Sequence, residues 1–277
     1  MNVLNLIISA ELLCFLVEIR SQSLNETLVL VHTIFRHGDR NPDLLNLYSS
    51  NPYYDESNYA PFGYGQLTNA MLAGLFPPTK DLMWLEGLNW QPISFNYVER
   101  QYDKELFCYG CPNWDTNLDA YLKSADGQDF TNKYEETFKY ISENTGENIT
   151  DIIQVYYMYF GFLIQEELNF TLPEWTKAVY PYPMRNITTD YYALMFSTKN
   201  LKIMSAGYLL KKIIIDTQNR INGSFPQRKM YIYCAHENNI ASVLKIFNLW
   251  NDEEIAVYGS YILIELHYIN GTYGIKV

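Results

Sequence analysis

Short apolar runs near both ends of the chain predict β-strands. The run at 27–34 is mainly apolar, which is typical of a buried strand. Further runs rich in Ile, Tyr and Phe lie at 92–97, 229–234 and 260–268. The pattern therefore predicts strands contributed by segments that are far apart along the chain.

Apolar residues at helical spacing fill the middle of the chain. The stretch at 152–168 is apolar nearly all round, which indicates a buried helix. The predicted helices cover 112–124, 130–141, 152–168, 188–220 (two helices, with a break near Lys199-Asn200) and 238–250. Strands at both ends with helices between them predict an α/β fold, a mixed sheet flanked by helices and carrying an inserted helical lobe. We expect the α/β core in 24–100 and 187–277 and the lobe in 101–186.

The N-terminus is apolar from Val3 to Ile19, interrupted by Glu11 and Glu18. This run is short for a membrane-spanning helix, which needs about 20 apolar residues. It fits a cleaved signal peptide at 1–23, although no Lys or Arg precedes it. The alternative is an amphipathic start of the folded domain.

Six Asn-X-Ser/Thr triplets favour a secreted or lysosomal glycoprotein, because roughly three would be expected by chance. They begin at Asn25, Asn148, Asn169, Asn186, Asn222 and Asn270.

Cysteine usage is uneven. Once Cys14 is assigned to the leader, Cys108, Cys111 and Cys234 remain, an odd number for a secreted protein. The Cys-Tyr-Gly-Cys pair could form a local disulfide, a redox pair or halves of two bridges. A zinc site would need a second such pair, and the sequence has none.

Charge narrows the class of ligand. The formal net charge is −11, which argues against binding to nucleic acid. A small anionic substrate is still allowed, because solvent screens distant charges over about 8–10 Å and a local arginine cluster can dominate.

A burst of charged residues follows the first predicted strand: Arg36, His37, Gly38, Asp39 and Arg40. Ligands of open α/β sheets bind at the C-terminal ends of the strands. Two neighbouring guanidinium groups repel each other unless an anion lies between them, and their forks match phosphate oxygens. A histidine flanked by cations is favoured in its neutral form, which has a nucleophilic ring nitrogen. The alternative is a solvated charged turn.

A second histidine follows another predicted strand. His236 and Glu237 come after the run at 229–234 and precede a predicted helix, whose N-terminus can attract an anion. Glu237 could protonate a leaving alkoxide, or it could serve only as a favourable acid in the first helical turn. Because both histidines follow strand ends, they can meet over one sheet.

These residues resemble the two signatures of the histidine acid phosphatases. Residues 36–42 read Arg-His-Gly-Asp-Arg-Asn-Pro, against the family's Arg-His-Gly-x-Arg-x-Pro, and His236-Glu237 is similar to its second signature. Segments at 63–68, 72–78 and 90–93 are most similar to insect acid phosphatases. The resemblance covers nearly the whole chain from about Thr27.

The resemblance implies two-step hydrolysis of a small phosphomonoester. It implies that His37 attacks phosphorus and forms a phosphohistidine, while Arg36 and Arg40 hold the phosphoryl oxygens. It further implies that His236 contacts the phosphoryl group and that Glu237 protonates the leaving oxygen. No metal or organic cofactor is implied, and no nucleic acid or stable membrane span is expected. The resemblance also allows the protein to form a homodimer.

The chain also departs from the family. There, a helix and a central strand carrying an Arg-Ser-Thr-Asp motif follow Gly-Gln-Leu-Thr, and its arginine is a third phosphate clamp. Here Thr68-Asn69 is followed directly by Ala70, without the residues of that helix and strand. Losing one such clamp commonly costs about 2.7–4 kcal/mol of transition-state stabilisation. Arg100 could stand in, although nothing in the sequence argues for it.

We therefore expect a shortened histidine acid phosphatase that lacks one central strand and helix. Whether this form is catalytically active is left open by the sequence. The alternatives are a secreted, inactive phosphatase-like binding protein and a member of the phosphoglycerate mutase branch, which shares the Arg-His-Gly core.

Overall fold

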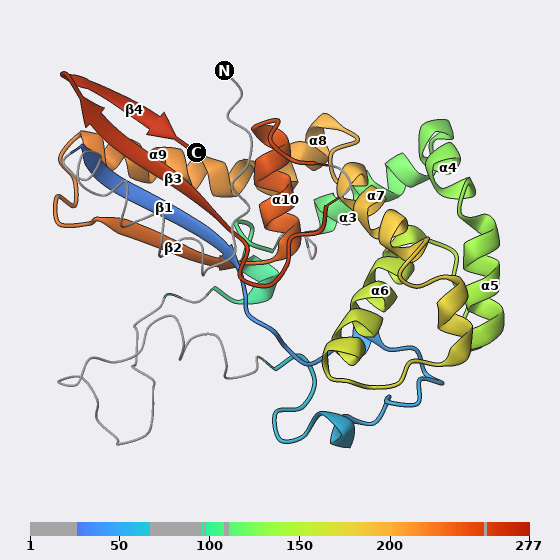
Figure 1. Cartoon of the computed structure of the whole chain (residues 1–277). Coiled ribbons are helices and arrows are strands. Elements are labelled where there is room, and N and C mark those ends of the chain that lie inside the picture. Colours follow the sequence, from blue (N-terminus) through green and yellow to red (C-terminus); the bar gives the residue numbers. More distant parts are fainter. Residues whose placement is uncertain (1–26, 67–95, 97, 108–110, 252–253) are drawn as a thin grey trace, which may run out of the picture. The chain divides into compact units, whose positions relative to one another are not determined.

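The computed structural model of the chain describes residues 27–66, 96, 98–107, 111–251 and 254–277 (Figure 1). The expected leader at 1–23, Cys108 and nearly all of the expected strand at 92–97 lie outside these residues. The described chain forms two compact units. The first takes its residues from 1–37, 99–115 and 198–277, and the second from 38–98 and 116–197.

The first unit contains a four-stranded mixed sheet in the order β2-β1-β3-β4 (Figure 1). β1 runs parallel to β2, and β3 is antiparallel to both β1 and β4. The register places Arg36, the last residue of β1, opposite Ala235, the last residue of β2. The residues that follow the two strands therefore leave the same edge of the sheet. The strands are β1 (Leu28–Arg36), β2 (Met230–Ala235), β3 (Tyr261–Ile269) and β4 (Thr272–Lys276).

The strands predicted at 27–34, 229–234 and 260–268 are confirmed as β1, β2 and β3. β4 was not predicted from the sequence. Asn270 and Gly271 join β3 to β4 with φ angles of 51° and 82°, which a two-residue hairpin turn of type I′ requires. This Asn-Gly pair was the available signal for the hairpin.

Two helices of the first unit, α9 (Tyr208–Ile221) and α10 (Glu237–Ile246), contact β1 (Figure 1). Their apolar sides and the inward-facing residues of the sheet form one core. Burying these side chains fixes the strand ends that carry the histidines, since each buried aliphatic side chain contributes about 1.5–3 kcal/mol. The core includes Ile34, Leu209, Ile213, Tyr233, Ile240, Val243, Ile262 and Ile264.

The helix pair predicted at 188–220 is present, but its break falls slightly earlier than expected. α7 (Met184–Leu194) ends before Thr198, whose side chain accepts a hydrogen bond from the backbone N–H of Leu201. α8 (Lys199–Lys202) then continues through one π-helical turn, Ile203–Gly207, into α9.

The second unit is built around α6 (Ile152–Glu167), which is buried along most of its length and packs against α7. Asp151 caps α6 by accepting hydrogen bonds from two backbone N–H groups at its start. Phe162 of α6 contacts the rings of Tyr48, Trp175 and Tyr180. The helix predicted at 152–168 is thus confirmed.

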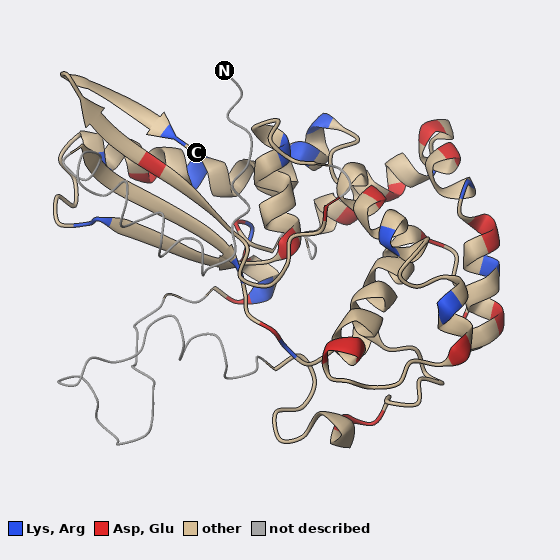
Figure 2. Cartoon of the chain, in the orientation of Figure 1, with Lys and Arg blue, Asp and Glu red and all other residues tan. Residues whose placement is uncertain are grey.

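The remaining helices follow the predicted pattern with one correction. The prediction of a single helix at 130–141 was wrong: two helices, α4 and α5, flank a break at Lys133-Tyr134. Acidic side chains are frequent on α4 and α5 (Figure 2). These helices are α3 (Pro112–Leu122), α4 (Ala125–Asn132) and α5 (Glu135–Thr145), with short helices at Leu44–Asn46, Glu56–Tyr59, Arg100–Tyr102 and Glu174–Ala178.

The two units do not follow the boundaries expected from the sequence. Residues 38–66 group with the helices, because Asn46 donates a hydrogen bond to the Tyr157 carbonyl at 2.9 Å and its own backbone approaches Gly161. Residues 101–107, expected in the lobe, group with the sheet instead. Within the described ranges, every helix is too short or too polar to cross a bilayer.

Candidate functional site

The candidate site lies where β1 and β2 end side by side. The backbone N–H of His37 donates to the Ala235 carbonyl at 3.0 Å, which extends the strand pairing by one residue. On the other side, the N–H of Arg36 donates to the Ser260 carbonyl at 2.8 Å. The backbone that carries the first two signature residues is therefore held on both sides.

The two histidines expected to act together lie against each other. The ring centres of His37 and His236 are 5.6 Å apart, and the ring planes meet at 76°. At this spacing the two imidazoles are in edge-to-face contact at the sheet edge. An anion bound beside the pair could be contacted by nitrogens from both rings.

His236 is oriented by the start of α10, where it is the N-cap residue. Its backbone N–H donates to Asn239 Oδ1 at 3.0 Å, and its Nδ1 lies 3.2 Å from the same oxygen. Asn239 thus occupies the Nδ1 side of the ring, and Nε2 is the nitrogen left for a ligand. Asn239 is 2% exposed, so packing holds the arrangement in place.

Arg36 is buried beside the histidines, and its guanidinium is held by protein groups. Its Nη1 donates to the Ala256 carbonyl at 2.6 Å, its Nε lies 3.4 Å from Glu237 Oε2, and its Cζ lies 4.1 Å from the Tyr258 ring centre. The side chains of Arg36 and Glu237 are 4% and 9% exposed. Glu237 therefore stabilises Arg36, whatever its part in proton transfer.

Aromatic rings flank the histidine pair on two sides. The Tyr258 ring centre is 5.8 Å from that of His37, and the Phe107 ring centre is 6.0 Å from that of His236. The guanidinium carbon of Arg100 lies 4.0 Å from the Phe107 ring centre. Phe107 and Tyr258 were not predicted as site residues, because tertiary contacts alone place them here.

The structure brings together four of the five expected site residues. Arg36, His37, His236 and Glu237 all lie in the first unit. Arg40 belongs to the second unit, where its Nη2 donates to Asn46 Oδ1 at 3.4 Å. Its role in binding phosphate stays a prediction.

The residues described offer no cluster of three or more His, Cys, Asp or Glu side chains that could hold a metal ion. Cys111 and Cys234 form no disulfide with any described residue.

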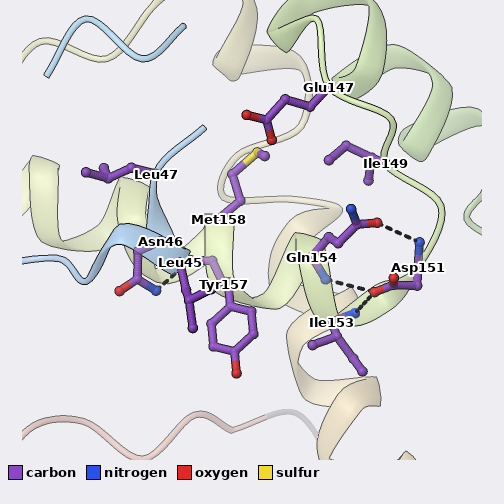
Figure 3. Close-up of a pocket in the computed structure, with 10 residues that line it drawn as sticks. All are labelled: Leu45, Asn46, Leu47, Glu147, Ile149, Asp151, Ile153, Gln154, Tyr157 and Met158. Atoms are coloured by element: carbon purple, nitrogen blue, oxygen red, sulfur yellow. Dashed lines mark hydrogen bonds between the residues drawn. The ribbon is translucent and has the colours of Figure 1, made fainter. Parts of the chain in front are cut away.

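A separate pocket of about 300 Å³ lies wholly in the second unit, between the short helix at 44–46 and α6 (Figure 3). Its polar groups are already used: Asn46 Nδ2 donates to the Tyr157 carbonyl, and Asp151 caps α6. This pocket contains none of the expected site residues.

Comparisons with known proteins agree with the chemistry of the site, although no family model matches the chain. The chain is 31% identical to venom acid phosphatase Acph-1 of Apis mellifera, covering 89% of this chain and 76% of that protein. It is 25% identical to putative acid phosphatase 5 of Caenorhabditis elegans (90% and 68% covered) and 23% identical to human prostatic acid phosphatase (92% and 78% covered). Its fold matches that of Klebsiella sp. ASR1 phytase with a TM-score of 0.58 at 12% identity, covering 90% of this chain and 82% of the phytase.

The alignment with the bee protein also bears on the expected shortening. It spans 297 positions, whereas 89% of the 277 residues here is about 247 residues. About 50 aligned positions therefore have no residue of this chain opposite them. The expected absence of one central strand and helix stays a prediction.

The 31% identity reaches across three quarters of the bee phosphatase, and the fold matches that of a phytase. These findings show that the chain belongs to the histidine acid phosphatases, a family of phosphoric monoester hydrolases.

Proposed function

We propose that the chain hydrolyses small phosphomonoesters through a phosphohistidine at His37. The observation that carries the proposal is the 5.6 Å separation of the His37 and His236 rings, beside the buried Arg36. In the first step a ring nitrogen of His37 bonds to phosphorus as the ester P–O bond breaks. In the second step water attacks phosphorus, the P–N bond breaks and inorganic phosphate leaves.

The other residues of the site would support both transfers. His236 would contact a phosphoryl oxygen through Nε2, because Asn239 occupies its Nδ1. Arg36 and Arg40 would neutralise the phosphoryl charge, as guanidinium groups commonly do. Glu237 would give a proton to the leaving oxygen.

We place this activity outside the cytosol, in a secreted or lysosomal glycoprotein with a signal peptide at 1–23. The relatives are described as venom, prostatic and lysosomal acid phosphatases. The candidate acceptor asparagines Asn148, Asn169, Asn222 and Asn270 are all exposed, as glycosylation requires. Disulfide pairing and a homodimer stay predictions.

A second candidate function is a secreted phosphatase-like protein that binds phosphorylated ligands without turning them over. The roughly 50 aligned positions that have no counterpart here favour this alternative, because a transition-state contact could lie among them. Both candidates predict binding of phosphate. Only the first predicts release of phosphate from an ester.

The full chain, secreted from a eukaryotic host, separates the two candidates. We expect it to hydrolyse p-nitrophenyl phosphate at acidic pH and to lose this activity in His37→Ala. Binding of inorganic phosphate without hydrolysis would favour the second candidate. Hydrolysis that is unchanged in His37→Ala would reject His37 as the nucleophile.

A further inference from the structure

A second cation lies next to the histidine pair, on the same unit. Arg100 opens the short helix Arg100–Tyr102, and its guanidinium stacks on the Phe107 ring, which in turn contacts the edge of His236. The two contacts, 4.0 Å and 6.0 Å, put the guanidinium carbon within about 10 Å of the His236 ring centre.

Arg100 differs from Arg36 in how its charge is used. Arg36 is buried and paired with Glu237, whereas Arg100 is exposed and no described carboxylate pairs with it. The carboxylate of its neighbour Glu99 instead accepts a hydrogen bond from Gln101 at 3.0 Å. Stacking on Phe107 orients the guanidinium plane and leaves its N–H groups, which lie in that plane, for an anion.

Burial also sets the direction in which a substrate can extend. Arg36 and Glu237 are 3% and 7% exposed, so the side of the histidines that they cover is closed to a bulky group. Phe107 is only half-buried and Arg100 is exposed. The side of Phe107 and Arg100 therefore offers the organic part of a phosphomonoester held at the histidines a way to solvent.

We propose that Arg100, held against Phe107, binds a second anionic group on the leaving-group side of the substrate. The site would then favour phosphomonoesters that carry a carboxylate or a further phosphate, at about one aromatic ring's length from the reacting phosphorus, over neutral ones. This inference rests on the proposed function, since it takes the histidine pair to be the phosphoryl site.

Two phosphonates that the enzyme cannot hydrolyse test the proposal by binding alone. Benzylphosphonate carries one anionic group, and 4-carboxybenzylphosphonate adds a carboxylate on the far side of the ring. Titration calorimetry on the full chain should show that the carboxylated probe binds about fivefold tighter, which is the upper range for a solvent-exposed ion pair. Added salt should reduce this preference.

The variant Arg100→Met should abolish the preference and leave the affinity for benzylphosphonate nearly unchanged. Arg228→Met is the matched control. Arg228 is also an exposed arginine on an aromatic ring, 4.9 Å from the Tyr231 ring centre, but it lies beyond the opposite end of β2. The preference should survive in this variant.

Three results would count against the proposal in different ways. Equal affinities for the two probes in the wild-type chain would overturn the inference alone, as would a preference that persists in Arg100→Met. Failure to bind either phosphonate, together with failure to hydrolyse p-nitrophenyl phosphate, would overturn the proposed function and this inference with it.

Discussion

His37 and His236 lie with their ring centres 5.6 Å apart although 199 positions separate them in the sequence. The parallel register of β1 and β2 produces this approach, because Arg36 pairs with Ala235 and each histidine is the next residue along. The relationship therefore depends on the sheet core and on the buried groups beside it, and both can be perturbed separately.

The first prediction concerns the buried pair of Arg36 and Glu237. Arg36→Ala removes one partner of a buried ion pair and leaves the Glu237 side chain, which is 9% exposed, without it, so we expect a loss of about 3–5 kcal/mol in unfolding free energy. Glu237→Gln keeps the shape of the side chain and should cost less. Urea unfolding followed by circular dichroism measures both. Lys123→Ala removes an exposed ion pair and should have no measurable effect, and an equally small effect of Arg36→Ala would contradict the account.

The second prediction concerns stability in acid. His32 of β1 is 1% exposed, its Nε2 lies 3.0 Å from Thr217 Oγ1, and burial lowers its pKa from 6.5 to about 4. Between these two values the unfolded chain binds a proton that the folded chain does not. Stability should therefore fall as pH drops from 6.5 to 4, by at most about 3 kcal/mol from this residue.

His32→Gln should remove most of this pH dependence, whatever it does to stability at neutral pH. The measurement is the difference in unfolding free energy between pH 7 and pH 4 for the two proteins. If the variant loses as much stability in acid as the wild type does, His32 is not the cause.

The third prediction concerns the close approach of α6 to the short helix at 44–46. A β-carbon at Gly161 would lie 2.0 Å from the Asn46 carbonyl oxygen, so the backbone must shift to admit it. Gly161→Ala should destabilise the protein by about 1–3 kcal/mol or more. Gly274→Ala, where no atom lies within 4 Å of the new carbon, is the matched control for thermal unfolding. Similar melting temperatures for the two variants would show that this contact is absent in solution.

The fourth prediction assigns Asn239 as a positioning residue for His236. Asn239→Ala frees the imidazole, and misplacing a group in this way can cost up to about 100-fold in kcat/KM. Asn239→Asp keeps the contact but adds a negative charge, which favours the protonated imidazole. The alkaline limb of the pH–rate profile should therefore move to higher pH in Asn239→Asp. An unmoved profile would leave Asn239 as a helix cap only.

The sequence predicted the parts of this protein that depend on local patterns. Continuous apolar runs marked β1, β2 and β3, and the signature residues marked both histidines. β4 escaped prediction because its residues are exposed and show no buried face. Phe107 and Tyr258 escaped because no local pattern distinguishes an active-site ring from a core ring. The pairing of Arg36 with Glu237 follows from the strand register, which the sequence alone does not give.

The position of Arg40 was also beyond the sequence. It follows His37 by only three residues, but the chain passes there from one unit to the other. Asn41 Nδ2 donates to the carbonyls of Tyr59 and Gly63, and these bonds tie the segment to the second unit. Spacing within a signature therefore did not predict which unit each of its members would join.

The measurement closest to the central claim is direct detection of a phosphorylated histidine. The full chain would be mixed with p-nitrophenyl phosphate at acidic pH, quenched in alkali within milliseconds and analysed by tandem mass spectrometry. We predict phosphate on the imidazole of His37, and no label at this site in His37→Ala. Steady hydrolysis with the label on another residue, or with no labelled residue at any time point, would contradict the account.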